Sequence, residues 1–288
     1  MIEALIQPFA ESDTMRRALV ALIALSFSAP PIGAFLMLRR MSLMSEALSH
    51  AILPGAAVGY LLAGLSLFAM SIGSFAAGLA IVLAAGLVAR FTKLHEDASL
   101  AAFYVVSLAL GVTLVSIKGT DFDLLDLLFG NVLTISSATL ILIASIATFS
   151  LVLLAILYRP LVVECFDPHY LRSVSRASLP THFLFLVLVV LNLVGGFQAL
   201  GTLLAVGIML LPAVTARFWS EDLSGLIGAA IIAAVVSSIL GLLLAYHAKL
   251  PVGPVIILVG GTFYLLSILA GPKGGLIWRL VPRKHLEA

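Results

Sequence analysis

The sequence predicts an all-α membrane protein, a single bundle of about nine transmembrane helices over residues 1–288, and three observations support this fold class. Of the 288 residues, 62% are hydrophobic and only 10% are charged, whereas soluble domains are about 45–50% apolar and about 25% charged. Apolar runs of about 20 residues, the length that crosses a bilayer as a helix, recur along the chain. Basic residues gather in alternate connections between these runs.

Composition also excludes several classes of function. The net charge of +2 is too small to indicate a nucleic-acid partner. Cys165 is the only cysteine, which excludes an intrachain disulfide and a thiolate metal cluster. The chain has no Gly-x-x-x-x-Gly-Lys-Ser/Thr phosphate loop and no Gly-x-Ser-x-Gly nucleophile motif, so neither ATP binding of that kind nor hydrolase chemistry is indicated. We therefore expect a membrane-embedded protein that is not an enzyme.

Nine apolar segments satisfy the length requirement for a membrane span. The sixth and seventh are short and almost continuous with each other, so a broken hairpin, and eight spans in all, is the alternative. The predicted segments are 18–38, 43–64, 70–90, 99–117, 137–157, 181–197, 200–217, 224–247 and 253–270.

The basic residues predict which ends of these segments face the cytoplasm. If the connection at Arg39 and Arg40 is cytoplasmic, alternation places all but four of the 16 basic residues on that side. This bias predicts an external N-terminus and a cytoplasmic C-terminus. The four exceptions are Arg16, Arg17, Lys118 and Lys249. Acidic residues in the external connection 118–136 would draw cations by electrostatic steering or would simply be solvated.

The second segment carries an unusual set of polar groups. Glu46 and His50 are four residues apart, so on a helix they lie on one face. Pro54, four residues further, cannot donate to the carbonyl of His50. Gly55 and Gly59 form a small-residue face where another helix can approach. An acid within a span is costly and usually marks an ion or substrate path. Glu46 and His50 are therefore candidate metal ligands, and a polar clamp near the headgroups is the alternative.

The longest cytoplasmic connection, 158–180, has apolar residues that a solvated linker would not need. Asp167 followed by Pro168 is typical of a helix start, and Tyr170 and Leu171 would follow on the same short amphipathic helix. Exposed apolar side chains there favour docking onto another protein, whereas a helix lying on the headgroups is the alternative. The candidate docking residues are Phe166, Asp167, Pro168, Tyr170 and Leu171.

A third feature lies at the outer end of the eighth segment. His247 stands near the end of that predicted helix. A single histidine in such a place is either a structural group or one metal ligand. It is kept as a further candidate for the metal site.

Several of these stretches resemble one known family. Residues 39–55, Arg-Arg-Met-Ser-Leu-Met-Ser-Glu-Ala-Leu-Ser-His-Ala-Ile-Leu-Pro-Gly, are similar to the signature of the permeases of bacterial ABC importers for zinc, manganese and iron. Residues 126–133, 201–217 and 250–257 match at fitting positions. The resemblance covers nearly the whole chain and implies the fold of a type II ABC importer permease in the bacterial inner membrane.

The resemblance further implies a homodimer that works with two cytoplasmic ATPase subunits and an external metal-binding protein. It implies that residues 158–180 contain the coupling helix that docks on the ATPase. It also implies that Glu46 and His50 belong to the metal site. The family usually has Asp where this chain has Glu46. The extra methylene changes ligand reach by about one C–C bond.

These inferences lead to a hypothesis about cargo and mechanism. No cofactor is bound permanently, and a divalent cation, zinc first and manganese next, passes through by alternating access while partner subunits hydrolyse ATP. A carboxylate and an imidazole suit both metals. Three alternatives remain open: an ion-coupled secondary transporter in which Glu46 and His50 relay protons, a membrane scaffold without transport, and the same permease carrying an iron chelate.

Overall fold

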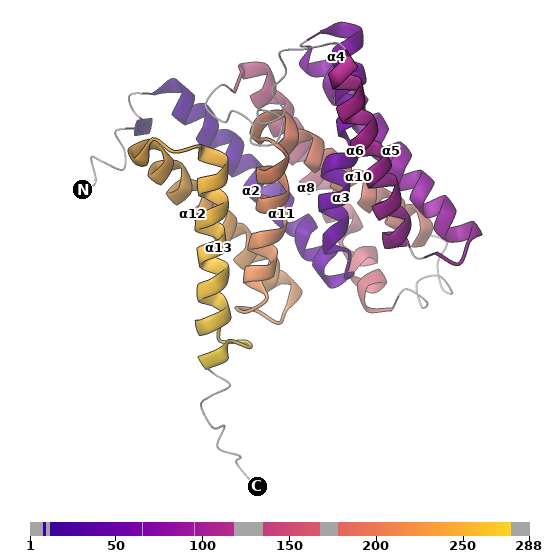
Figure 1. The fold of residues 1–288 in the computed structure, drawn as a ribbon. Coiled ribbons are helices and arrows are strands. Elements are labelled where there is room, and N and C mark those ends of the chain that lie inside the picture. The colour runs from indigo at the N-terminus through magenta and orange to yellow at the C-terminus, as the bar shows by residue number, and fades with distance from the viewer. Residues whose placement is uncertain are drawn as a thin grey trace.

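The chain is all-α, as the sequence predicts. The computed structural model describes residues 8–9, 12–64, 66–94, 96–117, 135–167 and 178–277, and every long element within these ranges is a helix. Figure 1 shows the arrangement of the bundle. The helices are α2 (Asp13–Leu38), α3 (Ser42–Ala51), α4 (Leu53–Ala63), α5 (Leu67–Phe91), α6 (Glu96–Ile117), α8 (Ser137–Phe166), α10 (Ser178–Leu200), α11 (Thr202–Ala216), α12 (Leu223–Ala248) and α13 (Val252–Ala270).

The predicted membrane segments all correspond to helical structure. Within the described ranges, eight helical segments are long and apolar enough to cross a membrane, with α3 and α4 together forming one of them. The seventh predicted segment becomes α11, which has 15 residues. At 1.5 Å per residue α11 spans about 22 Å, less than the hydrocarbon core of about 30 Å. The count of eight or nine therefore depends on whether α11 is a short crossing.

The direction of α11 favours nine membrane spans over eight. The end of α2, the end of α11 and the start of α12 meet in a small apolar cluster made of Ala34, Ala213, Ala216, Leu226 and Ala230. The start of α10 lies at the same end of the bundle, because His182 contacts Arg39 just after α2. α10 and α11 are therefore antiparallel, and the chain turns between them at Gly201, whose φ of 83° favours glycine.

A further backbone contact shows at which end of the bundle the last helix ends. The Lys273 N–H donates to the Phe218 carbonyl at 2.9 Å, so the end of α13 lies beside the end of α11. α2 starts at the opposite end of the bundle, at the upper left of Figure 1, while α13 runs towards the bottom. Between the start of α2 and the end of α13 the chain therefore crosses the bundle an odd number of times. This is expected if the two ends of the chain lie on opposite sides of the membrane.

A buried central helix organises the packing. α2 contacts α8, α10, α11 and α12, whereas α5 contacts α4, α6 and α10. Figure 1 accordingly shows α4, α5 and α6 on one side and α12 and α13 on the other. Small residues permit the closest approach: a Cβ built on Gly55 of α4 would overlap the carbonyl of Gly73 of α5. Gly55 therefore supplies a close helix contact, as its place in the sequence suggests.

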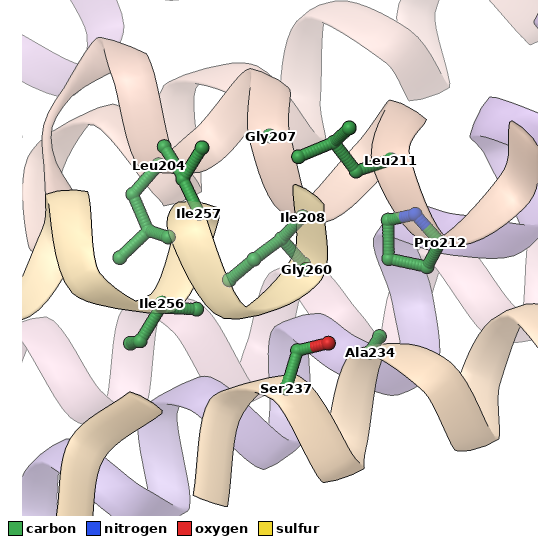
Figure 2. Close-up of a pocket in the computed structure, with 10 residues that line it drawn as sticks. All are labelled: Leu204, Gly207, Ile208, Leu211, Pro212, Ala234, Ser237, Ile256, Ile257 and Gly260. Atoms are coloured by element: carbon green, nitrogen blue, oxygen red, sulfur yellow. The ribbon is translucent and has the colours of Figure 1, made fainter. Parts of the chain in front are cut away.

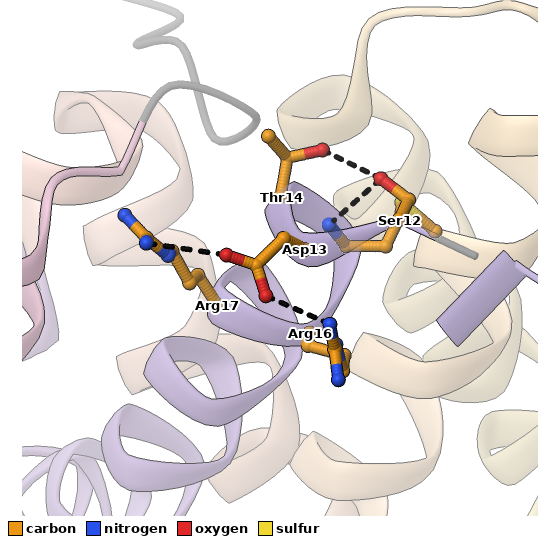
Figure 3. Close-up of polar contacts among 6 residues, drawn as sticks. Ser12, Asp13, Thr14, Arg16 and Arg17 are labelled. Carbon is orange, nitrogen blue, oxygen red and sulfur yellow. Dashed lines mark hydrogen bonds and ion pairs between the residues drawn. The ribbon is translucent and has the colours of Figure 1, made fainter. Parts of the chain in front are cut away.

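The two arginines at the first turn of α2, which oppose the charge bias, have a local partner. Figure 3 shows both side chains directed at Asp13. Arg16 Nη2 lies 2.8 Å from Asp13 Oδ1, and Arg17 Nη2 lies 3.2 Å from Asp13 Oδ2. Ser12 caps the helix by accepting from the Met15 N–H at 3.4 Å. Asp13 therefore offsets part of the positive charge at this end, although such exposed pairs contribute little to stability.

Candidate functional site

The candidate metal ligands lie on α3, a short helix with one buried and one open face. Its buried residues are Met44, Ser45, Leu48, Ser49 and Ala51. On the opposite face Leu43 is 80% exposed, Glu46 is exposed and His50 is half-buried. The spacing of three and four residues puts these three side chains on one stripe. The sequence predicts this shared face for Glu46 and His50.

The ring of His50 is held from one side. It lies against the Tyr104 ring of α6, with the ring centroids 5.7 Å apart and the planes tilted by 37°. His50 Nδ1 is buried and has no hydrogen-bond partner among the described residues. A buried ring nitrogen without a partner carries a desolvation cost. His50 Nδ1 therefore has hydrogen-bonding capacity that no described residue uses.

The predicted continuous helix 43–64 is interrupted. Ile52 separates α3 from α4 with φ −78° and ψ −15°, and Pro54, the second residue of α4, has no backbone N–H. The Ser107 hydroxyl of α6 donates to the Ala51 carbonyl at 2.9 Å. This bond satisfies a backbone group at the interruption and ties the end of α3, one residue from His50, to α6.

The pair can supply two protein ligands, one carboxylate oxygen and one imidazole nitrogen. Within the described ranges no group of three or more His, Cys, Asp or Glu side chains could hold a metal ion. Metal sites in proteins ordinarily use four or more ligands. One copy of the chain therefore offers an incomplete coordination shell at Glu46 and His50.

His247 lies elsewhere. It is an exposed residue in the last turn of α12, and its Nδ1 is 2.8 Å from the Leu243 carbonyl of the same helix. α12 packs on α2, α11 and α13, whereas α3 packs on α2, α6, α10 and α11. These contacts suit the structural interpretation of His247.

The predicted connection 158–180 overlaps two helices, because α8 continues to Phe166 and α10 begins at Ser178. Phe166, the last residue of α8, is 79% exposed. Asp167 caps the end of α8, and its N–H donates to the Val163 carbonyl. Pro168, Tyr170 and Leu171 lie outside the described residues. The part that is described therefore places one large exposed apolar side chain within the predicted segment.

The structure adds three residues to which the sequence assigned no site role. Arg39, after α2, forms a buried ion pair with Glu164 of α8 and also contacts His182 of α10. In the sequence Arg39 is a marker of membrane orientation and the first residue of the stretch 39–55. Glu164 falls in the predicted connection 158–180, where an acid is expected, and only the extension of α8 to Phe166 brings it into the bundle.

An apolar pocket between α11, α12 and α13 does not add to the site. Figure 2 shows it lined by Leu204, Gly207, Ile208, Leu211, Pro212, Ala234, Ser237, Ile256, Ile257 and Gly260. Its one hydroxyl, from Ser237, donates to the Ala233 carbonyl of its own helix at 2.6 Å. Such a lining cannot coordinate a cation.

Comparison with known proteins identifies the family. The model of the ABC 3 transport family matches residues 11–271. The chain belongs to this family. It is 32% identical over 278 residues to the "Manganese transport system membrane protein MntC" of Halalkalibacterium halodurans, with 95% of this chain and 94% of the relative covered. It is 29% identical to a "Probable iron transport system membrane protein" of Haemophilus influenzae, with 93% and 97% covered.

A solved structure has the same fold. "PsaBC from Streptococcus pneumoniae in complex with Fab" matches with a TM-score of 0.84 and 29% identity, covering 95% of this chain and 97% of the other. These relatives are named as membrane proteins of transport systems. The chain is therefore the multi-pass permease component of a metal ABC importer, a transport subunit and not an enzyme, as its sequence indicates.

Proposed function

We propose that this chain is the permease of an ATP-driven importer whose cargo is divalent manganese, with zinc next and iron as the alternative. Manganese stands first because several similar relatives carry it in their names. Iron is retained because two others are named as iron transport components. The observation that carries the proposal is the pairing of Glu46 with His50 on the open face of α3.

The open face of α3 supports a homodimer. A carboxylate facing lipid at mid-membrane costs about 2.5–3.5 kcal/mol, and Glu46 shares its exposed face with Leu43. A second copy packed on this face would cover Leu43 and remove Glu46 from lipid. Twofold symmetry would then bring two glutamates and two histidines together. A four-ligand set of this kind completes the shell that one chain leaves incomplete.

The ligand chemistry fits a transported ion. Carboxylate oxygen and imidazole nitrogen bind manganese and zinc, and neither is soft enough to demand copper. A transport site must also release its ion, so a small set of exchangeable ligands is an advantage. The charge of the cation would also compensate Glu46 within the membrane.

Two further partners complete the system. A cytoplasmic ATPase would dock on residues 158–180, where exposed Phe166 offers an apolar contact. An external binding protein would deliver the metal at the opposite end of the bundle, where α2 begins. This arrangement puts the N-terminus outside and the C-terminus in the cytoplasm of a bacterial inner membrane.

The test is metal uptake into proteoliposomes that contain this chain, its ATPase and its binding protein. Radiolabelled manganese, zinc and iron are compared with and without internal ATP. The proposal expects ATP-dependent uptake of manganese that persists in the presence of a proton uncoupler. Uptake that does not depend on ATP and is abolished by the uncoupler would indicate a secondary transporter. A complex that is assembled but transports none of the three ions would indicate a scaffold.

A further inference from the structure

A buried charged cluster lies where three helices meet. Arg39 Nη2 is 2.8 Å from Glu164 Oε1 and 2.8 Å from His182 Nδ1. The side chains of Arg39 and Glu164 are only 9% and 6% exposed. Because a guanidinium only donates, His182 Nδ1 is the acceptor in its contact with Arg39. One arginine therefore bonds α8 and α10 at the same time.

An aromatic ring packs against this cluster and continues into a group of rings. The Arg39 guanidinium carbon lies 5.0 Å from the centroid of the Phe185 ring. Phe35 packs edge-on against both Tyr158 and Phe185, with centroid distances of 6.1 and 6.3 Å. Arginine stacks well on aromatic faces in partly dry surroundings. The cluster is thus fixed in position by packing as well as by charge.

Stability alone gives a poor account of the cluster. Arg39 Nη1 and Glu164 Oε2 are buried, and neither has a hydrogen-bond partner among the described residues. A buried ion pair that is only partly satisfied is often no more stable than apolar side chains of similar volume. The charges therefore call for a role other than holding the helices together.

The location of each member suggests that role. Arg39 lies three residues before α3, which carries Glu46 and His50. Glu164 lies near the end of α8, inside the predicted ATPase-docking segment 158–180, and His182 lies just after that segment. The cluster is thus a direct physical connection between that segment and the start of the metal-ligand helix.

The corner between α2 and α3 is rigid enough to transmit movement. The N–H groups of Arg39, Arg40 and Met41 bond back to the carbonyls of Phe35, Met37 and Leu36. Arg40 has a φ of 59°, a left-handed conformation that is strained for a residue with a side chain. A displacement of Arg39 would therefore carry the start of α3 with it.

We propose that Arg39, Glu164 and His182 are positioning residues that couple movement of the ATPase-docking segment to α3 and its metal ligands. The inference rests on the proposed function, because it takes residues 158–180 as the docking segment. When the ATPase moves that segment, the ends of α8 and α10 move with it. Arg39, bonded to both, passes the displacement to the corner before Ser42.

The experiment follows α3 directly with a cysteine reporter. Replacing the single cysteine, Cys165→Ala, and introducing Leu43→Cys gives one thiol on the open face of α3, at the proposed contact between the two copies, so its accessibility reports on the position of α3. The complex with its ATPase is placed in lipid nanodiscs, and the rate of maleimide labelling is measured without nucleotide and after trapping with ATP and vanadate. The proposal expects the rate to differ between the two states in this parent complex, by about fivefold or more if the coupling has a typical strength.

Two variants test the cluster in that parent. Glu164→Gln removes one charge but leaves Arg39 buried without its ion partner, which could impair folding. The double variant Arg39→Met with Glu164→Met replaces both by apolar groups and is expected to fold with an unchanged or higher Tm. The matched control is Glu221→Gln, which removes an exposed ion pair with Lys273, 3.7 Å apart.

The proposal expects the double variant to bind the ATPase but to lose the nucleotide-dependent change at residue 43, while Glu221→Gln retains it. The proposal would be overturned if the double variant showed the same nucleotide-dependent change in labelling rate as the parent. It would also be overturned if the labelling rate of the parent did not depend on ATP. Metal uptake is measured separately. Failure of wild-type uptake would contradict the proposed function, whereas the labelling result still decides the coupling role.

Discussion

Glu46 and Leu43 share the exposed face of α3, and their combination is informative at the scale of single residues. Leu43 is 80% exposed, so the face is apolar enough to be covered by protein or lipid. A carboxylate on that face is costly against lipid and inexpensive beside a metal ion or a polar partner. The side-chain chemistry therefore favours a covered, metal-binding face.

The length of residue 46 provides the first prediction. Glu46→Asp keeps the charge and shortens the side chain by one methylene. We expect this variant to retain ATP-dependent manganese uptake with an altered KM, because ligand reach and not ligand type has changed. Uptake kinetics for manganese and zinc measure it. Complete loss of uptake with an intact complex would show that the site tolerates no change in reach.

The second prediction concerns the bond at the helix interruption. Ser107→Ala removes the donor to the Ala51 carbonyl, and the cost of leaving that buried carbonyl unpaired is about 1–3 kcal/mol. We expect a lower Tm in detergent. The control, Thr113→Ala, removes an exposed hydroxyl that bonds the Ala109 carbonyl of its own helix, and should change stability by less than about 0.5 kcal/mol. Equal Tm values for the two variants would contradict this role of Ser107.

At the scale of the helices, close backbone contacts determine how the elements pack. Gly55 of α4 faces Gly73 of α5 so closely that a Cβ has no room. Gly228 of α12 has no atom within 4 Å of the Cβ position. Gly55 thus permits a close contact between two helices, whereas Gly228 has room for a side chain.

The third prediction uses that contrast. Gly55→Ala forces α4 away from α5, and we expect a loss of about 1–3 kcal/mol from overpacking. Gly228→Ala meets open space and should gain about 0.5–1 kcal/mol from helix propensity. Thermal unfolding of the two variants in the same detergent is the measurement. A gain in Tm for Gly55→Ala would contradict the close contact.

Much of this organisation could be predicted from the sequence, because lipid forces apolar runs into helices. The segment 43–64 was predicted as helical and was found so, but its interruption at Ile52 depends on Pro54 and on Ser107 from another helix. The short length of α11 was anticipated by the weakness of the sixth and seventh segments. The Arg39–Glu164 pair could not be predicted, since its members are 125 positions apart and meet only in the folded bundle.

At the scale of the whole molecule, the direction of each helix determines which ends share a side. The hairpin of α10 and α11 makes the number of traverses odd, so the first turn of α2 and the loop after α11 lie at opposite ends. Basic residues are concentrated at the end that contains Arg39 and Arg217. The positive-inside rule then predicts that this end faces the cytoplasm.

The fourth prediction tests this topology. In a Cys165→Ala background, Thr14→Cys should react with an impermeant maleimide added to intact spheroplasts. Glu221→Cys should react only after the membrane is permeabilised. Labelling of both residues from the same side would mean an even number of crossings between them and would contradict the antiparallel pair of α10 and α11 as two spans.

The most direct test of the central claim compares two glutamates in the reconstituted importer. Glu46→Gln and Glu221→Gln each remove one carboxylate charge from an exposed side chain, but only Glu46 faces the predicted metal path. We expect Glu46→Gln to lower ATP-dependent manganese uptake at least as much as loss of an outer-shell partner does, about 10–100-fold, while Glu221→Gln transports like wild type. Equal uptake by the two variants, in complexes with equal amounts of bound ATPase, would contradict the assignment of the metal site to α3.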